Sequence, residues 1–135
     1  MGVVVFDSDV LIGFLSGHDP HHRAAVERVG ASLAPGNRRL LCAVNYAEIL
    51  IGPIRAGVHD RVKTMLTQFG IETIPVDDAL AERAATVQAR TDLKLPDAFA
   101  LATVIHAERR GAEDVQLATF DKKVIKAHAA LHSGD

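Results

Sequence analysis

Four carboxylic acids stand close to apolar segments of this 135-residue sequence. They are Asp7, Glu48, Asp97 and Asp121. Asp7 comes directly after the apolar run Val3–Phe6, Glu48 and Asp121 lie shortly after two further runs, and Asp97 lies in the first turn of an expected helix. If the runs are parallel strands, three of the acids reach the same edge of a sheet and the fourth can face that edge.

Acids that converge in this way predict a metal site, because neighbouring carboxylates repel one another unless a cation lies between them. A ligand set of oxygen atoms suits Mg²⁺ or Mn²⁺, and four acids provide enough ligands for one or two ions. Such ions activate water and stabilise the displaced oxygens during phosphodiester hydrolysis. The single cysteine, Cys42, excludes a multi-cysteine zinc site, and its apolar neighbours predict a buried strand thiol.

The elements that must position these acids are expected from apolar patterns and breaker residues. The predicted strands are 3–6, 40–44, 71–76 and 115–119, with Pro75 placing the third at a sheet edge. The predicted helices are a short one capped by Ser8 or Asp9, then 21–33, a short one capped by Asn45 that Gly52-Pro53 interrupts or ends, 58–69, one from Asp77 or Asp78 to Arg90, 95–110, and 121–131.

Strands that alternate with helices predict an α/β fold with a mostly parallel sheet covered on both faces. The length predicts one domain over residues 1–135. The net charge of −2 becomes +2 once the four acids are set aside, so the charge of the remaining residues does not repel an anionic substrate. The sequence has no secretory signal and no apolar run long enough to span a membrane, which predicts a soluble, cytoplasmic protein.

Each acid also has an ordinary structural interpretation when it is taken singly. Asp97 can complement the positive end of its helix, Glu48 can be a solvated helix residue, and Asp121 can be an N-cap. Asp9 is interpreted first as a helix cap or first-turn acid, and second as an additional member of the site. Asp7 is the hardest to explain in this way, because it stands at the mouth of a buried strand.

Four segments resemble the motifs of PIN-domain nucleases, in the family's order and at similar spacing. They are Val3–Ile12, Asn45–Leu50, Leu95–Ala102 and Leu117–Lys123. The size and the span of the motifs resemble VapC-type toxins of bacterial toxin–antitoxin pairs. The resemblance implies a PIN-like three-layer fold, a Mg²⁺- or Mn²⁺-dependent endoribonuclease, a cognate VapB-type antitoxin that blocks the site, and a toxin homodimer.

The same resemblance assigns the acidic site to Asp7, Glu48, Asp97 and Asp121, with Thr119 as a polar neighbour. Two features depart from the family. Asp9 stands where a small polar residue is common, and a last strand that the family often has lacks a clear counterpart.

Lys122 and Lys123 adjoin Asp121 and are the first candidates for contacts with RNA phosphates. Aromatic residues make up only 4% of the chain, so we expect RNA to be selected by shape and backbone rather than by stacked bases. Two histidine groups are interpreted as solvated loop and helix-end residues. They are His18, His21 and His22, and His128 and His132.

Two rival functions remain open. Asp7-Ser8-Asp9 after a strand also resembles the opening of haloacid-dehalogenase-like phosphatases, in which Asp7 would be a nucleophile and Asp9 an acid/base. A non-catalytic PIN-like interaction module is the second rival. A phospho-aspartate at Asp7 would support the first, and failure of the acids to bind Mn²⁺ would support the second.

Overall fold

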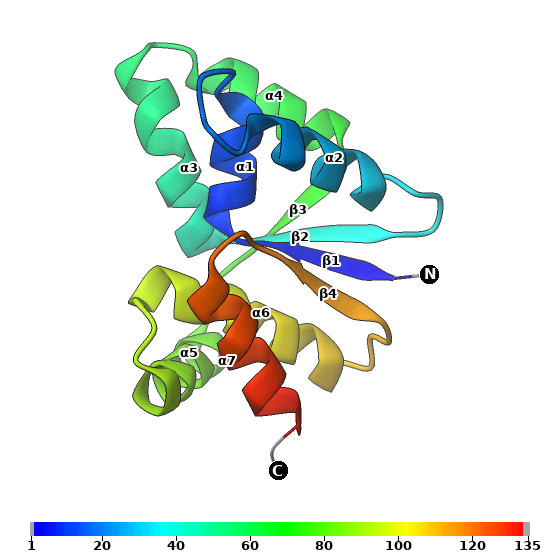
Figure 1. The fold of residues 1–135 in the computed structure, drawn as a ribbon, viewed down its shortest axis with the longest axis vertical. Coiled ribbons are helices and arrows are strands. Elements are labelled where there is room, and N and C mark those ends of the chain that lie inside the picture. Colours follow the sequence, from blue (N-terminus) through cyan, green and yellow to red (C-terminus); the bar gives the residue numbers. More distant parts are fainter. Residues whose placement is uncertain (1, 134–135) are drawn as a thin grey trace.

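The computed structural model describes residues 2–133, which form a parallel four-stranded sheet between two layers of helices (Figure 1). The strands are β1 (Val3–Phe6), β2 (Arg38–Cys42), β3 (Ile71–Ile74) and β4 (Val115–Ala118). The helices are α1 (Ser8–Leu15), α2 (His22–Ser32), α3 (Ala43–Arg55), α4 (His59–Gln68), α5 (Asp78–Thr91), α6 (Leu95–Arg109) and α7 (Lys122–Ser133). The expected α/β fold with a parallel sheet is confirmed, since every strand pair is parallel.

The strand order β3-β2-β1-β4 determines where a site can form. The chain proceeds from β1 through β2 to β3 in one direction, and β4 then pairs on the other side of β1. At such a reversal, the connections after two neighbouring strands leave toward opposite faces and open a crevice at their carboxyl ends. Phe6 pairs with Ala118 at this edge, and the Asp7 N–H donates to the Ala118 carbonyl at 2.9 Å.

The two faces of the sheet bury alternate side chains of β1, as the period of a strand requires. Val4 and Phe6 pack with α1 to α4 on one face, and Val3 and Val5 pack with α6 on the other. Cys42 is buried, as expected, against α5, α6 and α7. The helix layers α1–α4 and α5–α7 lie on opposite sides of the sheet in Figure 1.

The boundaries of the second strand and of the helix after it differ from the sequence prediction. The second strand begins at Arg38 because it pairs with Val3, and it ends at Cys42. Helix α3 then begins at Ala43, so Asn45 is a buried helical residue and not a cap. The same helix continues through Pro53 to Arg55, because a proline in the last turn removes one hydrogen bond while Ile49 and Leu50 still pack on the core.

The third strand, predicted over 71–76, ends at Ile74, so Pro75 lies just outside it, and β3 is an edge strand as predicted. Between residues 2 and 133 no strand follows β4, so β4 forms the other edge. No helix in this described part of the chain is long and apolar enough to cross a membrane.

Candidate active site

Asp7 directly follows β1 at the carboxyl edge of the sheet and is buried, with 1% of its surface exposed. Its Oδ1 accepts a hydrogen bond from the Ser8 N–H at 2.9 Å, so Asp7 is the N-cap of α1, and the prediction that Ser8 or Asp9 caps this helix is wrong. Burial, followed by repulsion from Asp9 and Asp97, raises the pKa of Asp7 to about 7, although the hydrogen bonds from Thr119 and Ser8 oppose this. A carboxyl group that resists ionisation at neutral pH in this way lacks a compensating positive charge.

Thr119 links the end of β4 to Asp7. Its hydroxyl donates to Asp7 Oδ2 at 2.8 Å, and its oxygen accepts from the Asp121 N–H at 3.1 Å. The Asp121 carboxylate in turn accepts from the Lys123 N–H at 2.8 Å, so Asp121 caps α7 as well as bordering the crevice. The role of Thr119 as a polar neighbour thus has a physical basis, because it fixes the orientation of one acid and the backbone of another.

Asp9, in the first turn of α1, links this helix to the segment after β4. Its Oδ2 accepts from the Phe120 N–H at 2.9 Å, and its Oδ1 is buried without a hydrogen-bond partner among residues 2–133. Burial raises the pKa of Asp9, hydrogen bonds from the backbone oppose this in part, and repulsion from Asp121 adds to it. Asp9 is therefore a first-turn acid, as one interpretation held, and it also faces the other carboxylates.

A second set of polar contacts positions Glu48. Ser8 Oγ donates to Glu48 Oε1 at 2.6 Å, and Asn45 Nδ2 contacts the same oxygen at 3.3 Å. Asn45 Nδ2 also donates to the carbonyl of Pro96 at 3.1 Å, next to Asp97. Sequence reasoning missed Asn45 as a site-positioning residue. Its spacing of one helical turn before Glu48 is the signal that identifies it, and the prediction that Asn45 caps the helix is wrong.

Asp97 lies in the first turn of α6 and faces the other acids. Burial raises the pKa of Asp97 first, and repulsion from Asp121, Glu48 and Asp9 raises it further. Asp97 thus lies within electrostatic reach of Asp7, Asp9, Glu48 and Asp121, which the structure places around the carboxyl ends of the strands.

The acids fit a hard divalent cation by their chemistry. Their donors are carboxylate oxygens, they repel one another, and Asp9 has a buried oxygen without a partner in the described chain. As the side chains stand, no three acidic, histidine or cysteine groups within residues 2–133 are grouped closely enough to hold a metal ion. A bound cation would relieve the repulsion among these carboxylates.

Lys122 and Lys123 are exposed at the start of α7, beside Asp121. His18, His21 and His132 are exposed, as the solvated interpretation predicts, whereas His22 and His128 are half-buried. His132 Nε2 contacts both oxygens of Glu108 at 2.8 and 3.0 Å, and the His21 ring stacks on Phe120.

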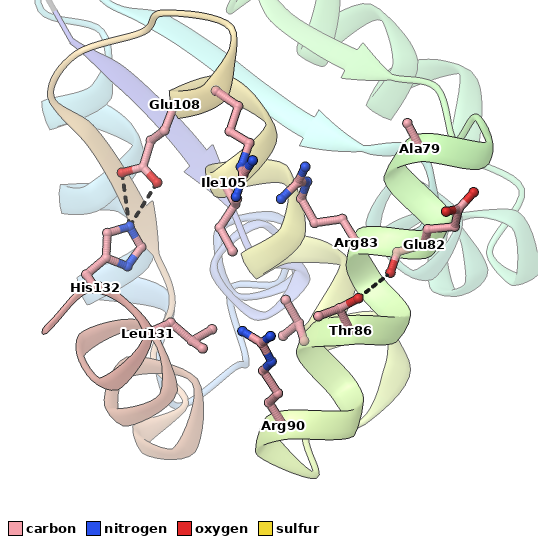
Figure 2. Close-up of a pocket in the computed structure, with 11 residues that line it drawn as sticks. Ala79, Glu82, Arg83, Thr86, Arg90, Ile105, Glu108, Leu131 and His132 are labelled. Atoms are coloured by element: carbon pink, nitrogen blue, oxygen red, sulfur yellow. Dashed lines mark hydrogen bonds and ion pairs between the residues drawn. The ribbon is translucent and has the colours of Figure 1, made fainter. Parts of the chain in front are cut away.

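A cavity of about 700 Å³ lies on the other side of the molecule, between α5, α6 and α7. Figure 2 shows Arg83 and Arg90 of α5 extending toward it, with the Glu108–His132 pair on the far wall. None of the five acids of the crevice lines this cavity. It is therefore separate from the candidate site.

Comparison with known proteins gives one family and a similar structure. The model of the family described as PIN domain matches residues 4–130. A structure described as a toxin–antitoxin complex from Klebsiella pneumoniae is 26% identical over 93% of this chain and 90% of that one, with a TM-score of 0.69. A search of curated proteins returns no match.

Proposed function

Because this chain belongs to the PIN domain family, whose members are generally nucleases, we propose that it is a metal-dependent endoribonuclease and the toxin of a toxin–antitoxin pair. The proposal includes Mg²⁺ or Mn²⁺ as cofactor, RNA as substrate and the cytoplasm as location. The observation that carries it is the convergence of the acids on the crevice between β1 and β4, where the pKa of Asp7 is raised to about 7.

Asp7, Glu48, Asp97 and Asp121 are the proposed ligands of one or two ions, and Asp9 is an auxiliary acid. When bound, a divalent ion lowers the pKa of water and neutralises charge on the reacting phosphate. Thr119 and the Ser8 N–H hold the two oxygens of Asp7 in fixed directions. Asp121 either completes the ligand set or accepts a hydrogen bond from the attacking water, and no side chain of the protein becomes a nucleophile.

Lys122 and Lys123 are proposed to bind RNA phosphates on either side of the cleaved bond. Both are exposed at the start of α7 and follow Asp121 directly, so their ammonium groups can reach a backbone that enters the crevice. Attraction by these cations offsets the repulsion that the acids exert on an approaching polyanion.

The first prediction concerns the reaction. Purified protein is expected to cleave RNA in the presence of Mg²⁺ or Mn²⁺ and to stop when EDTA removes the ion, because the acids then repel the phosphate. Gel analysis of a labelled RNA mixture measures this, with magnesium added back as the control. Formation of a phospho-aspartate at Asp7 would favour the phosphatase alternative, and Mn²⁺ binding without any cleavage of RNA would contradict the proposed activity.

The antitoxin is proposed to occupy an apolar groove between α1 and α3. The groove has a volume of about 620 Å³, and Ile12, Leu15 and Ile51 are among its lining residues. Glu48 also lines it, so the groove leads to the acidic site. A segment with an apolar face and a cationic side chain would fill the groove, contact the acids and block access of RNA. A homodimer, detectable by light scattering, is part of the same proposal.

The second prediction tests this groove. Ile51→Glu is expected to weaken binding of the antitoxin encoded by the adjacent gene by about tenfold or more, because a charge then faces the apolar partner. Ile51 is 51% exposed, so the fold tolerates the change. Val26→Glu, at a 44% exposed position of α2 outside the groove lining, is the control in calorimetry. Equal affinity for both variants would place the antitoxin elsewhere.

A further inference from the structure

An aromatic pair adjoins the acidic crevice. The ring of His21 stacks on the ring of Phe120, with 4.8 Å between the centroids and 19° between the planes. Phe120 stands between Thr119 and Asp121, and its N–H donates to Asp9. The guanidinium carbon of Arg28 lies 5.3 Å from the centroid of the Phe120 ring. A flat ring system and a cation are thus present beside the proposed reacting centre.

The pair is held in place before any ligand arrives. The His21 N–H donates to Asp19 Oδ1 at 2.8 Å, and the His22 N–H donates to the Asp19 carbonyl at 3.0 Å. The His22 ring contacts the Gly13 carbonyl at 2.8 Å, which attaches this turn to α1. Phe120 packs against the hydrophobic core, while His21 is exposed. A ring that is already ordered loses little conformational entropy when a second ring stacks on it.

We propose that the exposed ring of His21, supported by Phe120, stacks a nucleobase of single-stranded RNA next to the cleaved bond, and that Arg28 contacts the adjoining phosphate. The inference rests on the proposed ribonuclease function and extends it to substrate selection. Proteins usually bind unpaired nucleotides by stacking their bases on aromatic side chains. Base-paired RNA cannot offer such a face, so the platform selects unpaired segments.

The low aromatic content predicts that stacking surfaces are scarce, and the sequence predicts a solvated His21, which the structure shows exposed but stacked on Phe120. The turn before α2 and the end of β4 are far apart in the sequence, and only the fold places their rings in contact. One histidine and one phenylalanine, positioned beside the acids, suffice for a platform.

Binding to short RNA tests the platform without cleavage. Single-stranded hexamers that carry 2-aminopurine at successive positions are added to the protein in EDTA, and fluorescence quenching reports stacking. The wild-type protein is expected to quench one or two positions. His21→Ala is expected to abolish this quenching and to weaken binding about fivefold to 100-fold. His21→Phe keeps an aromatic ring without a charge and is expected to retain both the quenching and the affinity for the hexamers.

The controls separate stacking from charge and from general damage. Arg83→Gln removes a cation of the opposite helix layer, where Figure 2 shows it facing the other cavity, and is expected to bind the hexamers as the wild type does. If His21→Phe fails like His21→Ala, or if duplex RNA binds as tightly as the hexamers, the stacking proposal is overturned.

The same measurements distinguish this inference from the proposed function. Quenching that depends on His21, without metal-dependent cleavage in the first experiment, overturns the nuclease activity and leaves the platform supported as an RNA-binding surface. Cleavage without His21-dependent quenching overturns the platform alone.

Discussion

The Asp97→Asn protein is expected to fold normally and to lose RNA cleavage by more than about 100-fold. Removing a residue that only supports a metal ligand already lowers metal affinity or activity about 10- to 100-fold, and Asp97 is proposed to be a ligand itself. Asparagine keeps the size of the side chain but removes the charge that would bind a cation. Repulsion from Asp121 and Glu48 also disappears, so the variant is expected to be at least as stable as the wild type. Initial rates on a labelled RNA at saturating Mn²⁺ measure the loss.

A matched control lies five residues earlier in the chain. Asp92 is exposed at the C-cap of α5, with φ at 59°, a left-handed conformation that asparagine tolerates well. Asp92→Asn is therefore expected to cleave RNA at the wild-type rate. Full metal-dependent cleavage by Asp97→Asn would show that the role assigned to Asp97 is wrong, while leaving the family membership unaffected.

The Asp7→Asn protein is expected to be more stable than the wild type at pH 8, in buffer that contains EDTA, by about 2 to 4 kcal/mol. The pKa of Asp7 is raised from 3.8 to about 7 in the folded state. Below pH 3.8 the group is protonated in both states and changes nothing. Between pH 3.8 and 7 the unfolded chain loses its proton first, so stability falls as the pH rises, and the full penalty persists above pH 7.

Urea unfolding at pH 4.5 and pH 8 checks this expectation. The two proteins should differ little at the lower pH and clearly at the higher one, because asparagine has no charge to bury. Glu113→Gln, at an exposed position, should follow the wild type at both. Adding Mn²⁺ at pH 8 should stabilise the wild type and not Asp7→Asn, because only the intact acid set gains from the cation. A stability gain for Asp7→Asn that is equal at both pH values would contradict the electrostatic explanation.

Local patterns in the sequence are enough to predict the strands and helices and to select the candidate acids. Val3–Phe6 is uniformly apolar and β-branched in the main, so it predicts a buried strand, and Asp7 at its end has no simple packing role. Pro75 predicts an edge strand because proline cannot donate to a ladder, and β3 does lie at the edge, although it ends one residue before the proline. The ends of strands and helices are predicted less well. Strand β2 begins at Arg38 because Arg38 pairs with Val3, and helix α3 continues past Pro53 because its side chains pack on the core.

The tertiary structure alone decided which groups meet. The order β3-β2-β1-β4 sets the ends of β1 and β4 side by side, so that the Thr119 hydroxyl reaches Asp7 and the Phe120 N–H reaches Asp9. Asn45 contacts both Glu48 and the carbonyl of Pro96 only because α3 and α6 begin at the same edge.

The sequence by itself determined the strands, the helices and the acids that follow them, because periodicity and capping are properties of neighbouring residues. Strand order, the raised pKa of Asp7 and the stack of His21 on Phe120 arise between residues far apart in the chain. They depend on the packing of complete helix layers against the sheet, and no local pattern encodes that packing.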